Sequence, residues 1–75
     1  MKTFKEIKQE LLKGEMVELD TVHGDMIELF LGHQDRFCLM LNAKVIMSVK
    51  TWKPIENKLN TFEGLATVEN QIDVV

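Results

Sequence analysis

The spacing of apolar residues changes near the start of this 75-residue chain, and that change constrains its fold more than any other feature. Three apolar residues first recur at the spacing of one helix face: Phe4, Ile7 and Leu11. Thr3 and Glu6 stand at the two positions of a capping box. Gly14 follows, where glycine commonly ends a helix, so residues 4–13 are predicted to be helical.

Alternation of apolar and polar residues, which is the period of a strand, then runs through four segments. Turn-forming residues separate them and give strands at about 15–22, 26–31, 36–42 and 44–50. In the fourth strand, Val45, Met47 and Val49 form the expected inward set. Further signals predict a helix at 54–62 that begins at Pro54, a short strand at 65–68, and a tail at 69–75.

These elements predict a single α+β domain over residues 1–75, with an N-terminal helix packed on a four- to five-stranded antiparallel meander and a short second helix. A small SH3- or Sm-like barrel is the alternative topology. One ten-residue helix covers only part of such a sheet, so either the second helix or a partner must cover the opposite face. The candidate residues for an oligomer contact on that face are Met16, Phe30, Met40 and Ile46.

The chain is small for a domain without covalent or metal cross-links. Cys38 is its only cysteine, and no Cys/His set has the spacing of a zinc site, so neither a disulfide nor a metal is expected. A core of this size supplies only about 3–5 kcal/mol, and self-association is a common remedy. We therefore expect a homo-oligomer. The charged N-terminus predicts no signal peptide, and the short apolar runs predict no membrane segment. The single cysteine favours a reducing, cytoplasmic location.

Charge is unevenly distributed along the chain. Residues 14–35 contain six acidic residues and no lysine or arginine, whereas 36–58 contain five basic residues and one acidic residue. On one interpretation, adjacent strands neutralise each other across the sheet. On a second, the chain has two opposed patches, which suit head-to-tail self-association or a charged partner. On the second interpretation, the candidate partner-binding residues of the acidic hairpin are Glu18, Asp20 and Glu28.

No group of residues is typical of an active site. His23 and His33 each precede an aspartate by two residues, but both pairs fall in predicted turns, where such polar residues are common. Ser48 lacks the context of a catalytic nucleophile, and Cys38 lies between apolar neighbours. The chain also has no glycine-rich phosphate loop. We therefore expect a protein that is not an enzyme and that has no cofactor.

The only tryptophan, Trp52, stands between Lys50 and Lys53 at the end of a predicted strand. A tryptophan flanked by cations can stack on a base while the cations hold phosphate, with Arg36 as a further contact. It can also anchor a protein interface, or close one end of the core. The sequence leaves these three roles open.

Three short motifs over residues 4–42 resemble the first motif of the Sm-like RNA-binding barrels: Leu12-x-Gly14-x-x-Val17, a turn at Gly24, and Asp35-Arg36-Phe37 followed by Leu41-Asn42. The resemblance implies a closed barrel that binds RNA. Leu29-Phe30 stand where that family has a glycine, and residues 45–49 do not match its second motif. The similarity is therefore one of small-barrel patterning and does not assign the chain to the family.

The leading hypothesis is a small non-enzymatic interaction protein that binds another macromolecule, with a protein as the expected partner. Small size, an acidic patch and the lack of catalytic motifs would suit an inhibitor of a host protein encoded by a phage or mobile element. Single-stranded nucleic-acid binding by a small barrel, through Arg36, Lys50, Trp52 and Lys53, is the first alternative. A small-ligand binder, for example of a nucleotide, with its site at an oligomer interface is the second.

Overall fold

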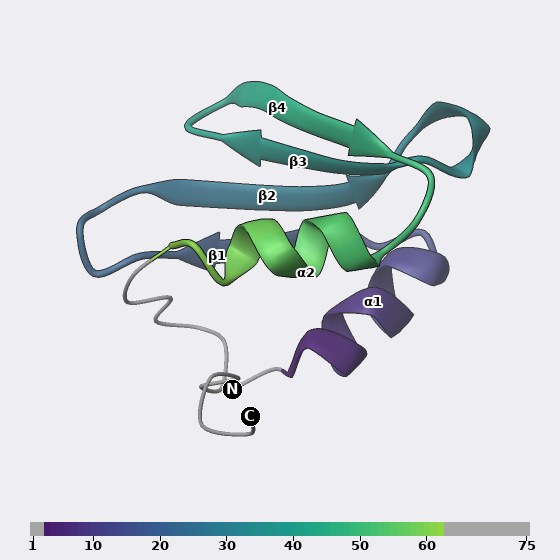
Figure 1. Ribbon diagram of the computed structural model, residues 1–75, viewed down its shortest axis with the longest axis horizontal. Coiled ribbons are helices and arrows are strands. Elements are labelled where there is room, and N and C mark those ends of the chain that lie inside the picture. The colour runs from purple at the N-terminus through teal and green to yellow at the C-terminus, as the bar shows by residue number, and fades with distance from the viewer. Residues whose placement is uncertain (1–2, 63–75) are drawn as a thin grey trace.

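The chain forms an α+β domain whose elements follow the predicted order (Figure 1). The computed structural model describes residues 3–62. Its elements are α1 (Phe4–Leu12), β1 (Val17–Asp20), β2 (Met26–Leu31), a short 3₁₀ turn η1 (His33–Asp35), β3 (Phe37–Leu41), β4 (Lys44–Val49) and α2 (Lys53–Leu59). The predicted fold class is therefore confirmed. The strand predicted at 65–68 and the tail at 69–75 lie outside the described residues.

The first helix, α1, begins at the residue that the sequence marks and ends one residue before the predicted end. Thr3 Oγ1 accepts a hydrogen bond from the backbone N–H of Glu6 at 3.2 Å, and Glu6 Oε1 accepts one from the N–H of Thr3 at 2.9 Å. This pair satisfies two N–H groups that have no partner within the helix. After the helix, Gly14 adopts a φ of 89°, which glycine does without steric cost, and the chain turns toward β1.

The four strands form one antiparallel sheet in the order β1-β2-β3-β4. Leu29 of β2 pairs with Val17 of β1 on one side and with Leu39 of β3 on the other. Within residues 3–62 the sheet is open, with β1 and β4 as its edges, so the alternative of a closed SH3- or Sm-like barrel is not adopted. Closure requires strongly curved strands, and β2 has no glycine or bulge at which to bend.

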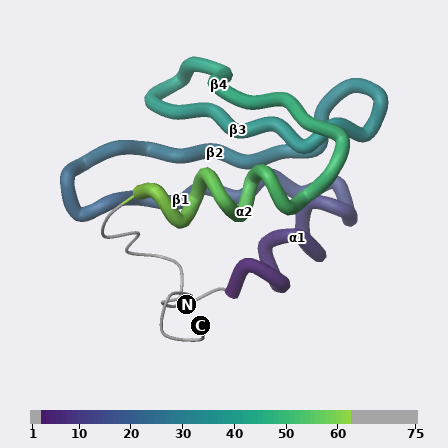
Figure 2. Tube along the Cα trace, viewed as in Figure 1, coloured from purple at the N-terminus to yellow at the C-terminus, as the bar shows by residue number. Residues whose placement is uncertain are grey.

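One side chain ties the two hairpins together. Asn42, in the turn between β3 and β4, donates from Nδ2 to Asp25 Oδ1 at 3.1 Å and accepts from the N–H of Met26 at 3.0 Å. Asp25 belongs to the turn between β1 and β2, so both turns lie at one end of the sheet, opposite η1 (Figure 2). Asn42 and Ala43 have φ values of 49° and 69°, as a two-residue hairpin turn requires.

Both helices cover the same face of the sheet. The first, α1, packs over β1 and β2, while α2 packs over β3 and β4. Residues from the helices and from alternate strand positions form one core: Phe4, Ile7, Leu11, Val17, Leu19, Ile27, Leu29, Phe37, Leu39, Trp52, Ile55 and Leu59. The possibility that the second helix covers the opposite face is therefore wrong. The short connection after β4 returns α2 to the face that α1 already covers.

Strand β4 departs from the predicted alternation. Leu39 pairs with Met47, but the next residue, Met40, pairs with Val45, so Ile46 is an extra residue in a bulge. Met47 and Val49 pack against the core as predicted. Val45 is 54 % exposed and faces away from it. The predicted inward orientation of Val45 is therefore wrong, because the bulge shifts the alternation by one residue.

Two predicted elements extend too far. The strand predicted at 15–22 spans only Val17–Asp20, because Thr21 organises a turn. The Thr21 hydroxyl accepts hydrogen bonds from the backbone N–H groups of His23 and Asp25, at 3.2 and 3.1 Å. The helix predicted at 54–62 is Lys53–Leu59, and the chain leaves helical geometry after Asn60.

Candidate interaction surface

The side of the sheet turned away from α1 and α2 is the candidate functional surface, and we refer to it as the open face. Alternation along the strands assigns it the residues that lie between the core positions. They are Glu18, Asp20, Met26, Glu28, Phe30, Cys38, Met40, Val45 and Ser48, with Ile46 beside them in the bulge. Within residues 3–62, no helix packs on this face.

One row of side chains crosses all four strands of the open face. Glu18 pairs with Glu28, Glu28 pairs with Met40, and Met40 pairs with Val45. Directly paired side chains have Cβ atoms about 4.5–5.5 Å apart, so each one meets the next. The row is therefore acidic over β1 and β2 and apolar over β3 and β4.

The acidic half consists of the three residues predicted to bind a partner: Glu18, Asp20 and Glu28. Glu18 and Asp20 are exposed, and Glu28 is half-buried between Glu18 and Met40. No ion pair engages any of them in the part of the chain that the structure describes. Adjacent strands therefore do not neutralise these charges, since Glu18 has another carboxylate as its direct neighbour, which costs free energy.

The apolar half contains residues from three strands. Phe30 and Met40 are half-buried, whereas Met26, Val45 and Ile46 are exposed. Of the four residues predicted as an oligomer contact, Phe30 and Met40 lie on neighbouring strands of this face, and Ile46 lies in the bulge next to Val45, the pairing partner of Met40. The fourth, Met16, is exposed just before β1. Met26 and Val45 are exposed on this face but were not among the predicted contact residues, and the orientation of Val45 follows from the bulge.

The four residues of the nucleic-acid alternative do not form one surface. The Arg36 guanidinium lies on the open face against Ser48 of β4, donating from Nε to Ser48 Oγ at 3.0 Å and from Nη2 to the Ser48 carbonyl at 2.8 Å. Lys50 is exposed after β4. Trp52 and Lys53 belong to the start of α2, on the other side of the sheet.

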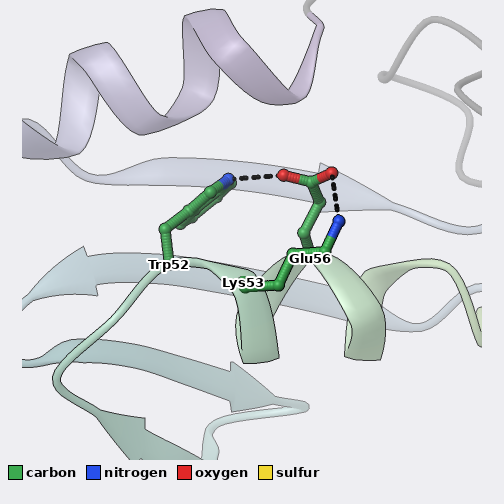
Figure 3. Close-up of polar contacts among 3 residues, drawn as sticks. All are labelled: Trp52, Lys53 and Glu56. Atoms are coloured by element: carbon green, nitrogen blue, oxygen red, sulfur yellow. Dashed lines mark hydrogen bonds and ion pairs between the residues drawn. The ribbon is translucent and has the colours of Figure 1, made fainter.

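Trp52 is a core residue, with only 8 % of its surface exposed, and Figure 3 shows its indole N–H directed at the Glu56 carboxylate. Its ring packs edge to face against Phe37, with centroids 5.6 Å apart, and its Nε1–H donates to Glu56 Oε2 at 2.8 Å. The other Glu56 oxygen lies 3.7 Å from Lys53 Nζ. Base stacking requires an exposed ring face. The position of Trp52 therefore argues against that use of the indole.

The remaining candidate side chains are separated from one another. His23 and His33 are exposed in turns at opposite ends of the sheet. Cys38 is buried, with Sγ 3.6 Å from the Arg36 carbonyl and 3.7 Å from Ser48 Oγ. Among the described residues, no three His, Cys, Asp or Glu side chains are placed to hold a metal ion.

Comparisons of the chain with protein-family models, with curated proteins and with solved structures yield no match. In residues 3–62, neither helix has the length and apolar character needed to cross a membrane. A function for this chain is therefore inferred from the open face.

Proposed function

We propose that this protein is a non-enzymatic interaction protein whose open face binds a basic segment of another protein. The observation that carries the proposal is the row from Glu18 and Glu28 to Met40 and Val45, on a face that no described element covers. A partner that places cations next to apolar side chains would match both halves of this row.

Electrostatics favour a basic partner. Two directly paired carboxylates repel each other, and no described cation forms an ion pair with either of them. Departures from local stability rules are typical of functional sites, where binding compensates for the cost. Lysines or arginines of a partner would neutralise Glu18, Asp20 and Glu28 and would also speed the encounter.

The apolar half would supply the buried centre of the contact. Methionine is flexible and adapts to different partner shapes, while an aromatic ring such as that of Phe30 adds area at low entropic cost. An inhibitor encoded by a phage or mobile element would act in this way, by occupying a surface of a host protein. Nucleic acid is less well supported, because three carboxylates on this face would repel phosphate groups.

Reversing the paired charges tests the proposal. The double variant E18K/E28K exchanges one like-charge pair for another, so the domain is expected to stay folded. Wild-type protein is immobilised and incubated with a lysate of the producing cell, and bound proteins are chemically cross-linked to it. The wild type should capture a defined partner. The amount captured by the double variant should be at least about tenfold lower, the equivalent of 1.4 kcal/mol of binding free energy. Capture is quantified by mass spectrometry. The single variant E18K creates an opposite-charge pair. It should bind the partner more weakly than the wild type, yet its free energy of unfolding should be higher by about 0.2–1 kcal/mol.

A matched control separates the position of the charges from their number. The triple variant E15K/N57K/N60K changes the net charge by the same amount at exposed positions away from the open face. It should capture the partner as the wild type does. If the double variant and the control capture equal amounts, the open face is not the docking surface.

A further inference from the structure

We infer that copies of this protein associate head to tail, with one flank of α1 in one copy docked on the open face of the next. This inference rests on the proposed function, since it uses the same open face. The partner that would bind the open face is a second copy of the chain. The α1 flank consists of Lys5, Lys8, Leu12 and Lys13.

The α1 flank is a basic surface that also carries one exposed apolar residue, Leu12. Residues 5, 8 and 12 recur at helical spacing, one position after the buried residues 4, 7 and 11. Leu12 is 58 % exposed, which leaves a large apolar side chain in water beside lysines. No ion pair engages Lys5, Lys8 or Lys13 within residues 3–62.

The other helix offers a weaker match to the open face. Lys53 of α2 lies 3.7 Å from a Glu56 carboxylate oxygen. Lys58 lies over the ring of Phe62, with Nζ 5.7 Å from the centroid. Both cations of α2 thus already interact with a described side chain, whereas among residues 3–62 no carboxylate forms an ion pair with a lysine of the α1 flank. The α1 flank is therefore the basic surface best suited to the open face.

The α1 flank and the open face are complementary in charge, and a helix can pack on a sheet. Lysines of the α1 flank would approach Glu18, Asp20 and Glu28, and Leu12 would contact the apolar half near Met40. A helix lying on a sheet is also the packing that this chain already uses on its covered face (Figure 1). The contact would give each sheet a helical layer on both sides, one from its own chain and one from a neighbour.

The positions of the two surfaces determine the symmetry of the assembly. The helices lie on one side of the sheet and the open face on the other (Figure 1), so the surfaces that meet in this contact are two different parts of the chain. Such a heterologous contact builds rings or open chains, not simple dimers. A two-fold contact between open faces would instead add the carboxylates of both copies to one interface.

Sedimentation velocity and light scattering over a concentration series test the inference. At low ionic strength the average mass of the wild type should rise past that of a dimer. It should fall again at about 0.15 M salt, where charges are screened beyond about 8 Å. Two variants should each remain monomeric: K5E/K8E, which makes the α1 flank acidic, and E18K/E28K, which makes the open face basic. Circular dichroism confirms that both are folded.

Mixing the two variants provides the decisive result. K5E/K8E keeps the open face and E18K/E28K keeps the α1 flank, so an equimolar mixture should form a one-to-one complex held by that one intact contact, although each variant alone is monomeric. The control E15K/N57K/N60K should assemble as the wild type does. The inference is overturned if the wild type stays monomeric at low salt, if assembly stops at a dimer that K5E/K8E leaves intact, or if the mixture remains monomeric. If E18K/E28K still reduces partner capture in any of these cases, the proposed function stands without the inference.

Discussion

Replacing Leu39 by alanine should lower the free energy of unfolding by about 2–5 kcal/mol, whereas the same change at the next residue, Met40, should cost about 1 kcal/mol or less. Leu39 lies in the third strand with no exposed surface and packs in the core under the helices. Met40 points to the open face and is only half-buried. A domain of this size has few kcal/mol to lose, so L39A should be largely unfolded at room temperature.

Urea denaturation followed by circular dichroism measures both effects. The contrast between adjacent residues distinguishes the two faces of the sheet, because both side chains are of similar volume. Equal losses at the two positions, or a larger loss for M40A, would mean that the sheet is covered on the other side.

Replacing Trp52 by alanine is expected to have an effect of similar size, about 3–5 kcal/mol. The change removes the ring that packs against Phe37 and leaves the Glu56 carboxylate without its indole donor. The conservative variant W52F keeps most of the apolar area and loses the hydrogen bond, which is worth about 0.5–1.5 kcal/mol. It should therefore fall between the wild type and W52A when unfolding is followed by circular dichroism.

The same buried position predicts the optical behaviour of Trp52 in the wild type. Its emission should be weakly quenched by acrylamide and unaffected by short oligonucleotides at low salt. A W52A variant that loses less than about 1 kcal/mol, or strong quenching by an oligonucleotide, would place the ring at the surface and favour the nucleic-acid alternative.

Local signals in the sequence predict most of this fold. The capping box of Thr3 and Glu6, the glycine after α1 and the turns between strands act over a few residues, so their effects can be read without tertiary information. The ends of β1 and α2 are less predictable, because Thr21 and Asn60 are compatible with the element and with the turn that follows it.

Features that depend on tertiary structure could not be predicted. Whether α2 covers the same face of the sheet as α1 or the opposite face depends on the path of the chain after β4. The spacing of apolar residues does not predict that path. The bulge at Ile46 occurs where three apolar residues follow one another. The sequence therefore does not show which of them faces the core, and the orientation of Val45 could not be predicted. The role of Trp52 was also open, since a residue between two lysines can be buried or exposed; the contact with Phe37 decides it.

The candidate surface combines predictable and unpredictable parts. Alternation already places Glu18, Asp20 and Glu28 on one face, and Phe30 and Met40 with them. The direct pairing of Glu18 with Glu28 requires the register of the hairpin, which the turn at Thr21 sets. That both helices leave this face uncovered within residues 3–62 emerges only from the packing of α2.

The central claim is that the open face is the docking surface, and oxidative footprinting of the methionines tests it most directly. Met26 and Met40 lie on the open face, whereas Met47 packs against the core on the other side. Hydroxyl radicals are applied to the protein alone and to the cross-linked complex, and oxidation at each methionine is measured by mass spectrometry. The account predicts strong protection of Met26 and Met40 in the complex and no change at Met47. Unchanged oxidation of Met26 and Met40 in a fully formed complex would contradict it.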